Sequence, residues 1–372
     1  MSNPTNETWT AIILAAGQGT RMKSARPKVL HEIAGRALVS WVVQAALDAG
    51  AARCLVVVGH GRAEVERELD ANFGERVETV LQSEQRGTGD AVRCAVESTN
   101  ELGGRIAVLY GDCPLLPATL LRELVSATTT AGAECGLVTA SLDEPSGYGR
   151  IVRNESGAVL RIVEDRDCSE SERAILEVNP GLYAFDTAFI EEAIGQLGTD
   201  NAQGQLYLTD VVELAARRGE VVDLGGDMAE LTGVNTQRDL SLAAASRRRK
   251  MAEELALSGV HIDDLDNVYI DAECEIEPGA SLGANVHLRG RCIVRAGARI
   301  DVGSVLSDVI VAENASVLPY TIATDSTIGE GAQVGPFSHL RPGSELGPRS
   351  KVGNFSETKK TRLGEGSKVN HL

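Results

Sequence analysis

Residues 14–28 read LAAGQGTRMKSARPK, and this stretch decides how the first half of the chain is interpreted. The apolar run at residues 10–16 leads into it and predicts a short buried strand. Gly17 and Gly19 then open a loop. Four basic side chains stand within eight positions of that loop: Arg21, Lys23, Arg26 and Lys28. Glycines let backbone N–H groups approach a polyphosphate, and the basic groups neutralise its charge. The stretch therefore predicts a phosphate-binding loop that holds a nucleoside triphosphate.

Two common phosphate loops do not fit this spacing. The dinucleotide pattern GxGxxG needs its third glycine where Met22 stands, and the pattern GxxxxGK[ST] fails because Thr20 and Arg21 follow Gly19. A glycine-rich turn between a strand and a helix, with solvated basic residues, is the alternative interpretation of the two glycines. The density of basic residues favours the phosphate-binding loop.

Apolar runs alternate with amphipathic segments from this loop to residue 235. Strands are predicted at residues 11–15, 54–58, 106–110 and 136–140, and helices at residues 38–49, 89–97 and 118–128. This order is typical of an α/β domain with a mostly parallel, Rossmann-like sheet. Ligands of such sheets gather at the carboxyl ends of the strands, where both the Gly17 loop and Asp112 stand. The motifs thus lie where this fold binds its ligands.

Residues 236–259 are predicted to form a helix that links two domains, because LSLAAASRRRKMAEELAL contains neither Gly nor Pro. The basic run at residues 247–250 is interpreted as the solvated face of this helix. A nucleic-acid patch is the alternative, but the chain as a whole is acidic. The expected division is a first domain at residues 1–235, the linker helix at 236–259 and a second domain at 260–372.

A period of six residues begins after Val260. Aliphatic residues occupy one set of equivalent positions: Ile276, Leu282, Leu288, Val294, Ile300 and Leu306, then Ile328, Val334, Leu340, Leu346 and Val352. Small residues stand four positions after most of these: Ala280, Cys292, Ala298, Ser304, Ala332, Ser338, Ser344, Ser350 and Ser356. This is the hexapeptide repeat of a parallel β-helix, in which each unit forms one face of a triangular coil. The phase slips between Leu306 and Ile328, which predicts one or two displaced turns, and again from Lys359 to Leu363.

Composition limits the classes of function. With 36 basic and 53 acidic side chains the net charge is −17, which argues against nonspecific nucleic-acid binding, so anionic substrates must meet local basic clusters. Aromatic residues make up 3% of the chain, as expected if a β-helix core is built from aliphatic and small residues. Seven cysteines lack CxxC pairs and metal-ligand spacing, and the first residues predict neither export nor a membrane span. We expect a cytoplasmic protein with reduced thiols.

Further phrases downstream of the loop occur in the order found in one family. They read LQSEQRGTGDAV, LYGDCPLL, GYGRIV, IVED, VNPGL and GVN. Together with the loop and the repeats, they make the chain resemble the bifunctional N-acetylglucosamine-1-phosphate uridyltransferase / glucosamine-1-phosphate N-acetyltransferase family, from about Trp9 to the last residue. The resemblance implies a nucleotidyltransferase domain followed by a left-handed β-helix, and a role in making peptidoglycan and lipopolysaccharide precursors.

For the first domain the resemblance implies Mg²⁺-dependent transfer of UMP from UTP to N-acetylglucosamine 1-phosphate. Arg21 and Lys28 would be catalytic, because they hold the triphosphate while pyrophosphate departs. Asp112 and Asn235 would bind Mg²⁺ through a carboxylate and an amide oxygen. The alternative for Asp112 is a helix N-cap before Pro114.

The same resemblance implies the contacts of the two substrates. The nucleotide would contact Leu14, Ala15, Ala16, Gly17, Lys28, Gln82, Gly87 and Thr88, with the last three near the imide edge of uracil. The sugar would contact Gly149, Glu164, Asn179 and Asn235. Pro180 stands where the family usually has Thr, which removes a backbone donor and a hydroxyl beside Asn179. The sugar contacts are therefore less well defined than the phosphate contacts.

For the second domain the resemblance implies a homotrimeric acyltransferase that uses acetyl-CoA, with its sites between subunits. Arg341 and Lys359 would hold the phosphate of glucosamine 1-phosphate, and His371 would be the general base. The sequence stops at Leu372, one residue later. The coils that carry further substrate and CoA contacts in the family are expected to be missing, so we expect weak acetyl transfer, intact uridylyl transfer and an uncapped last coil.

Two other functions stay open at this point. The chain could make ADP-glucose or a GDP- or dTDP-sugar with a regulatory β-helix, although Gln82 and the NFSETKK segment count against this. It could also be a noncatalytic scaffold or exchange-factor subunit that retains both folds. The joint presence of Arg21, Lys28, Asp112 and Asn235 counts against that function.

Overall fold

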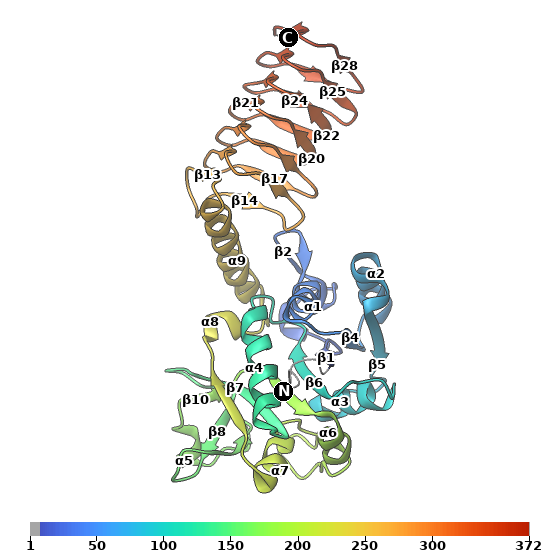
Figure 1. The fold of residues 1–372 in the computed structure, drawn as a ribbon, viewed down its shortest axis with the longest axis vertical. Helices are drawn as coiled ribbons and strands as arrows, with labels where there is room; N and C mark the ends of the chain where they lie inside the picture. The colour runs from blue at the N-terminus through green and yellow to red at the C-terminus, as the bar shows by residue number, and fades with distance from the viewer. Residues whose placement is uncertain (1–7, 372) are drawn as a thin grey trace, which may run out of the picture. The chain divides into compact units, whose positions relative to one another are not determined.

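The structure is a computed structural model that describes residues 8–371. The chain folds into two compact units (Figure 1). The first unit comprises the chain up to His31 and Ala37–Leu240. The second comprises Glu32–Arg36 and the chain from Ser241 onward.

The first unit is built around one sheet, which has ten strands within the described residues. The sheet order is β5-β4-β1-β6-β11-β7-β10-β8-β9, and β12 pairs with β7. Strands β5, β4, β1 and β6 are parallel, whereas β11, β10, β8 and β9 each pair antiparallel with their neighbours. The bounds are β1 Trp9–Leu14, β4 Arg53–Val58, β5 Val77–Leu81, β6 Arg105–Tyr110, β7 Cys135–Ser141, β8 Gly149–Arg153, β9 Val159–Val163, β10 Glu177–Asn179, β11 Tyr183–Asp186 and β12 Val222–Gly225.

Helices cover both faces of this sheet. Successive residues of β1 belong to different cores: Ile13 packs with α1, α2 and α4, and Ile12 packs with α3, α6 and α7. Burial on both faces explains why the strands read as continuous apolar runs. The bounds are α1 Leu38–Ala49, α2 Arg62–Phe73, α3 Thr88–Glu97, α4 Ala118–Ala131, α5 Glu170–Arg173, α6 Thr187–Ile194, α7 Asp210–Arg218 and α8 Met228–Leu231. Helix α9, Gln237–Leu257, belongs to the second unit from Ser241 onward. Two short strands, β2 Glu32–Ile33 and β3 Arg36–Ala37, pair with each other.

The second unit is a left-handed parallel β-helix with three faces (Figure 1). The first face contains β13 His261–Ile262, β16 Ser281–Leu282, β19 Arg299–Ile300, β21 Ser316–Val317, β23 Gln333–Val334, β26 Lys351–Val352 and β29 Lys368–Val369. The second contains β14 Tyr269–Ile270, β17 His287–Arg289, β20 Val305–Val311, β22 Ile322–Ile328, β24 His339–Leu340 and β27 Glu357–Thr358. The third contains β15 Glu275–Ile276, β18 Ile293–Val294, β25 Ser344–Leu346 and β28 Arg362–Leu363, with the later residues of β20 and β22 between them.

The predicted hexapeptide repeat is confirmed, and its phase slips have a local cause. Leu306 pairs with Ala323 and Val311 pairs with Ile328 on successive coils, so the inward positions of β20 and β22 are five residues apart rather than six. Both strands continue through a corner of the triangle, where the other coils have a turn. The third slip lies between Thr358 and Leu363.

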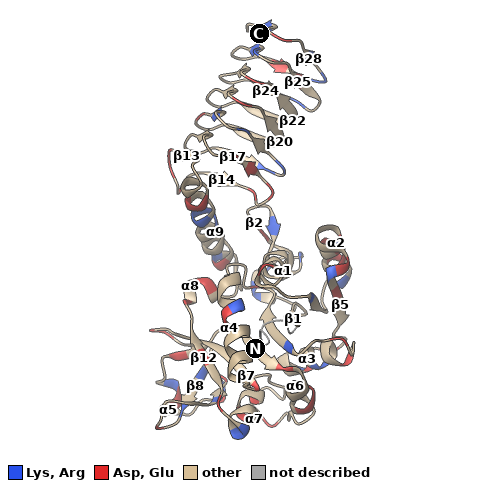
Figure 2. Cartoon of the chain, viewed as in Figure 1, with Lys and Arg blue, Asp and Glu red and all other residues tan. Residues whose placement is uncertain are grey.

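The basic run of α9 makes contacts within its own unit. Arg249 bonds to Glu253 at 2.5 Å and to Asp266 at 3.0 Å, and the guanidinium of Arg248 lies 4.8 Å from the centre of the Tyr269 ring. Acidic and basic segments both occur along α9 in Figure 2. All four residues of the run are half-buried, so this face of α9 is less exposed than the solvated face that the sequence predicts.

All seven cysteines lie within the described residues and carry free thiols. Burial raises the pKa of Cys54 to about 12 and also raises the pKa values of Cys113 and Cys135. These buried thiols are therefore weak nucleophiles. Among residues 8–371, none of the helices combines the length and apolar character needed to span a bilayer.

Candidate functional site

The predicted phosphate loop lies directly after β1. Gly19 adopts a left-handed conformation with φ of 61°. A Cβ on Gly19 would stand 2.5 Å from the Cβ of Lys28, so glycine is needed for the backbone to pass this side chain. The loop thereby returns Lys28 to the carboxyl end of β1.

A pocket of about 250 Å³ lies beside this loop. Its lining includes all eight residues predicted to contact the nucleotide, namely Leu14, Ala15, Ala16, Gly17, Lys28, Gln82, Gly87 and Thr88. Asp112 lies in the same lining, and Val29, Gln85, Ala91, Tyr110 and Gln205 also contribute. The structure thus brings together segments that are far apart in the sequence. Their contact with a nucleotide stays a prediction.

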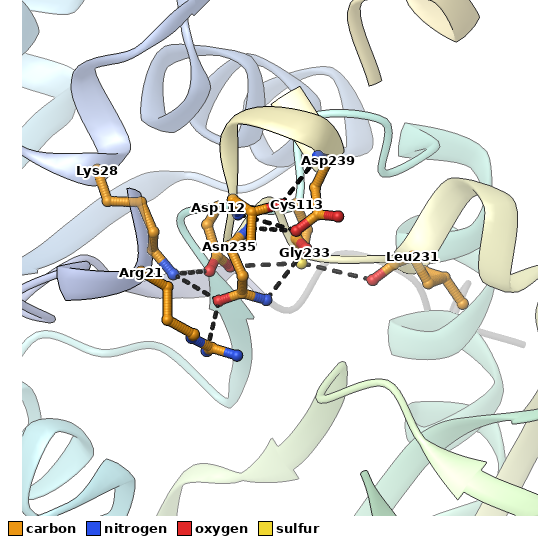
Figure 3. Close-up of polar contacts among 9 residues, drawn as sticks. Arg21, Lys28, Asp112, Cys113, Leu231, Gly233, Asn235 and Asp239 are labelled. Atoms are coloured by element: carbon orange, nitrogen blue, oxygen red, sulfur yellow. Dashed lines mark hydrogen bonds and ion pairs between the residues drawn. The ribbon is translucent and has the colours of Figure 1, made fainter. Parts of the chain in front are cut away.

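Four predicted side chains meet at this pocket (Figure 3). Nζ of Lys28 forms an ion pair with Oδ2 of Asp112 and donates to Oδ1 of Asn235 at 3.3 Å. Nη2 of Arg21 donates to the same Asn235 oxygen at 2.8 Å, across 214 residues of sequence. Two cations of the loop therefore converge on one carboxylate and one amide oxygen.

The two oxygens fit a hard divalent cation. Asp112 Oδ2 and Asn235 Oδ1 both contact the Lys28 ammonium, which shows that one positive charge can be shared between them. Carboxylate and amide oxygens suit Mg²⁺, which keeps waters and substrate phosphates as its other ligands. Within the described residues, no three His, Cys, Asp or Glu side chains gather into a metal cluster. A metal at Asp112 and Asn235 would therefore depend on ligands from the substrate.

Backbone contacts hold the two oxygens in place. Val234 N donates to Asp112 O at 2.8 Å, which joins the end of β6 to the segment that carries Asn235. The carboxylate of Asp239 accepts from the backbone N of Asn235 at 3.1 Å and of Thr236 at 2.8 Å. Desolvation opposes the charge on Asp239, but the hydrogen bonds from Thr236 and Asn235 outweigh it and lower its pKa. A charged carboxylate thus anchors the backbone of Asn235.

The residues predicted near the base are held by internal hydrogen bonds. Gln82 follows β5 and donates from Nε2 to Gly87 O at 3.2 Å and to Asp90 Oδ2 at 2.8 Å. The Thr88 hydroxyl accepts from Leu208 N at 3.1 Å. Gln85 donates to Ala16 O at 2.7 Å and so joins this segment to the phosphate loop. These contacts fix the side of the pocket where the base is predicted to bind.

The residues predicted for the sugar come together at one edge of the sheet. Asn179 and Gly149 are paired residues of β10 and β8, and Glu164 directly follows β9, the next strand. Asn179 donates to the Tyr183 hydroxyl at 2.6 Å and accepts from Gly181 N at 3.1 Å. Burial raises the pKa of Glu164, while its hydrogen bond from the Thr209 hydroxyl opposes the rise.

A buried carboxyl whose pKa is raised is common in functional sites, because the protein retains an unfavourable charge there. Pro180 is itself buried beside Asn179. The sugar-contacting roles of Gly149, Glu164 and Asn179 stay predictions.

The structure brings two of the three residues predicted in the β-helix together. Leu340 and Thr358 are paired on successive coils, so Arg341 and Lys359 occupy equivalent positions one coil apart. Arg341 bonds to Glu357 at 2.8 Å, and Lys359 is exposed. His371 is also exposed but follows β29 on the first face, whereas Arg341 and Lys359 follow strands of the second. The structure does not unite these three residues within one face of the coil.

Sequence reasoning missed four residues that shape the site. Asp90 and Asp239 hold Gln82 and Asn235, and Gln85 and Gln205 line the pocket. Of the four, Asp239 could have been found from a sequence motif. Thr236 and Asp239 are spaced as a capping box, and each bonds to the backbone N of the other. Gln205 had no such signal, because it reaches the pocket from a distant loop.

Known proteins resemble the chain at several levels. Residues 11–179 match the MobA-like NTP transferase domain family, and residues 265–371 match the GMPPB C-terminal domain family. The bifunctional protein GlmU of Sorangium cellulosum (strain So ce56) is 51% identical over 368 residues, which cover 98% of this chain and 77% of that protein. The GlmU proteins of Trichlorobacter lovleyi and Corynebacterium efficiens are each 42% identical over 97% of this chain, and the matches cover 79% and 75% of those proteins.

A solved UDP-glucose pyrophosphorylase complexed with UDP-glucose shares the fold of the first unit. Its TM-score is 0.53 at 18% identity, and the match covers 65% of this chain and 99% of that one. At this identity the likeness concerns the fold alone.

Proposed function

The chain belongs to the GlmU family of bifunctional transferases, and from this premise we propose the reaction that each unit carries out. In the first unit, UMP passes from UTP to N-acetylglucosamine 1-phosphate. A phosphate oxygen of the sugar attacks the α-phosphorus of UTP, the bond to the β-phosphate breaks, and pyrophosphate leaves. UDP-N-acetylglucosamine is the product.

One observation carries this proposal. Lys28 and Arg21 converge on Asp112 and Asn235 beside a pocket lined by the glycine loop. Nucleotidyl transfer requires little of a protein beyond alignment of the reactants and neutralisation of charge at the phosphates. Two basic side chains, together with a carboxylate that follows β6 and an amide oxygen that precedes α9, supply both.

Each side chain has a separate task in this reaction. Lys28 and Arg21 turn from Asp112 and Asn235 to the phosphates and stabilise the negative charge that grows on the departing pyrophosphate. Asp112 and Asn235 hold Mg²⁺, which neutralises phosphate charge when it is bound. Gln82, Gly87 and Thr88 receive the uracil, and Gly149, Glu164 and Asn179 receive the sugar.

Pyrophosphate release tests this proposal. The full chain is supplied with UTP, N-acetylglucosamine 1-phosphate and Mg²⁺, and UTP is then replaced by ATP, GTP or dTTP. Asp112→Asn should abolish most of the activity, whereas the matched change Asp143→Asn on an exposed loop should leave it unchanged. Equal activity of the Asp112 variant and the wild type contradicts the proposal, and a preference for another nucleotide favours a different sugar nucleotidyltransferase.

In the second unit, we propose that an acetyl group passes from acetyl-CoA to the amine of glucosamine 1-phosphate. Arg341 and Lys359 hold the sugar phosphate, and His371 takes the proton of the attacking amine. His371 follows a different face of the coil, which supports a site completed between the subunits of a homotrimer. The product of this reaction is the sugar phosphate that the first unit consumes.

We expect acetyl transfer by the 372 residues to be weak. Arg341 is paired with Glu357, and Lys359 and His371 are exposed, so contacts within one chain do not orient the three residues toward a shared substrate, and activity would depend on a neighbouring subunit. The release of CoA from acetyl-CoA in the presence of glucosamine 1-phosphate measures this activity. A turnover comparable to that of uridylyl transfer would contradict the expectation.

We propose that the protein works in the cytoplasm, where its substrates UTP and acetyl-CoA are made. Its seven free cysteines support a reducing compartment. UDP-N-acetylglucosamine would serve there as a precursor of peptidoglycan and lipopolysaccharide.

A further inference from the structure

The side-chain amide of Gln82 has a fixed orientation. Gln82 is 5% exposed and lies in the pocket lining, and its backbone N donates to Val58 O at 2.9 Å. Its amide nitrogen faces two oxygen atoms, Gly87 O at 3.2 Å and Asp90 Oδ2 at 2.8 Å. A backbone carbonyl and a charged carboxylate can only accept hydrogen bonds. The group that faces them must therefore be the NH₂ end of the amide.

The hydrogen bonds of the Gln82 amide determine which of its atoms is available to a ligand. Its NH₂ group has two hydrogens, and the two acceptors take both. The carbonyl oxygen Oε1 is the remaining polar atom of the side chain. Gln82 can therefore present an acceptor to the pocket, but it has no free hydrogen to donate.

Asp90 is itself held as a charged acceptor. It lies in the first turn of α3, is 4% exposed and forms an ion pair with Arg93 one turn later. The helix N-terminus and the guanidinium both stabilise its negative charge. Asp90 is absent from the pocket lining, so it can influence a ligand there only through its neighbours.

From this geometry we infer that Asp90 is a positioning residue that sets base selectivity by holding Gln82 Oε1 toward the imide N–H of uracil. The inference rests on the proposed function of the pocket. Uracil carries a hydrogen on N3, whereas cytosine has a lone pair at the same place. An acceptor aimed at N3 attracts the first base and repels the second, and an unmatched buried acceptor strongly disfavours a ligand.

The wild-type protein provides the first test. Binding of UTP, 5-methyl-UTP and CTP to the full chain with Mg²⁺ is measured by calorimetry. UTP and 5-methyl-UTP both carry the N3 hydrogen, so both should bind on the order of tenfold or more tightly than CTP. Equal binding of CTP and UTP would overturn the inference without the use of any variant.

The second test changes the group opposite Gln82. Asp90→Asn can donate as well as accept, so it removes the stronger of the two acceptor-only contacts that fix the Gln82 amide. The amide can then turn and present NH₂ to the pocket, opposed only by Gly87 O. The ratio of kcat/KM for UTP to that for CTP should fall by about tenfold. Asp90→Glu keeps an acceptor-only group and should retain the selectivity even if its activity is lower. Glu97→Gln makes the same charge change at an exposed position of α3 and should alter neither the selectivity ratio nor the activity.

These outcomes separate selectivity from a purely structural role. If Asp90 only stabilises α3, Asp90→Asn will lower the values for both nucleotides in proportion, and the inference is wrong. Should the wild type select UTP over CTP but form no nucleotide sugar, the proposed function fails while the inference stands. Should it form nucleotide sugars equally well from UTP and CTP, the inference fails while nucleotidyl transfer stands.

Discussion

Lys28 and Asp112 form an ion pair that joins the end of the phosphate loop to the end of β6, with side chains only 15% and 16% exposed. The two residues are 84 positions apart in the sequence. Because β1 and β6 are adjacent and parallel, the loop that follows one strand and the turn that follows the other open at the same edge of the sheet. The ion pair is a consequence of this topology, and it places the Lys28 ammonium next to both proposed metal ligands.

Replacement of Lys28 by Ala should lower kcat for uridylyl transfer by about 10²- to 10³-fold. The ammonium is expected to act on charge that grows in the transition state, so kcat should fall more than the affinity for UTP. Steady-state pyrophosphate release gives both quantities. Lys351→Ala is a suitable control, because Lys351 is an exposed lysine of β26 and lies outside the phosphate loop. A loss confined to KM would contradict a transition-state role for Lys28.

Replacement of Leu288 by Ala should destabilise the β-helix by about 2 to 5 kcal/mol. Leu288 is fully buried and lies between Ile270 and Leu306 on the coils before and after it. Scanning calorimetry of the full chain measures the change in the transition of this unit. Arg289→Ala in the same strand removes an exposed side chain and should change the stability by no more than about 0.5 kcal/mol. Equal effects of the two variants would contradict the inward orientation of the repeat.

The fold could be predicted wherever the burial of side chains gives the sequence a recognisable pattern of apolar residues. The strands expected at residues 54–58 and 106–110 are β4 and β6, and each expected element ends within three residues of its observed bounds. The position of β11 between β6 and β7 was not predictable, because antiparallel insertion depends on pairing between distant segments. The slips of the hexapeptide phase were visible, but their cause was not. It is the loss of one residue at a corner of the coil.

The candidate site was predictable where a side chain faces the pocket from a recognisable motif. Gln82 belongs to such a motif, and the structure places it in the lining. Asp90 lies in the same motif, yet its contact with Gln82 depends on the angle between the end of β5 and the start of α3. Such angles are set by packing and leave no mark in a single sequence. Residues that act through another side chain are therefore the ones that sequence reasoning misses.

Replacement of Glu164 by Gln should stabilise the protein near neutral pH and lower its activity. Burial raises the pKa of Glu164 above the value of 4.5 expected in the unfolded chain. The folded protein therefore binds this proton more tightly, and the stability that the carboxyl contributes below pH 4.5 is lost as the pH rises through its raised pKa. Gln avoids that loss, so the advantage of the variant in thermal melting should grow from acid to neutral pH. If Glu164 contacts the sugar, kcat/KM for N-acetylglucosamine 1-phosphate should fall by at least about tenfold.

Glu172→Gln is a control for which the change in stability at neutral pH should have the opposite sign. Hydrogen bonds from the Ser169 hydroxyl and backbone N lower the pKa of Glu172, so its stabilising effect is present at neutral pH and is lost as the pH falls. The control should therefore melt below the wild type at neutral pH and approach it in acid, with unchanged activity. A Glu164 variant that behaves like the control would contradict an unfavourable buried charge at position 164.

Replacement of Asp239 by Ala should raise the Mg²⁺ concentration needed for half-maximal uridylyl transfer by about 10- to 100-fold, as is typical of groups that orient metal ligands. Asp239 holds the backbone N of Asn235 and also caps α9 together with Thr236. Loss of the cap costs about 1 kcal/mol of stability. Thr236→Ala separates the two roles, because it removes the hydroxyl of the cap and leaves in place the hydrogen bond that Asn235 N donates to Asp239. If Asp239 only stabilises the helix, both variants will melt earlier and keep the same Mg²⁺ requirement. If it positions Asn235, only Asp239→Ala will need more Mg²⁺, and a titration of pyrophosphate release against metal concentration decides between the two.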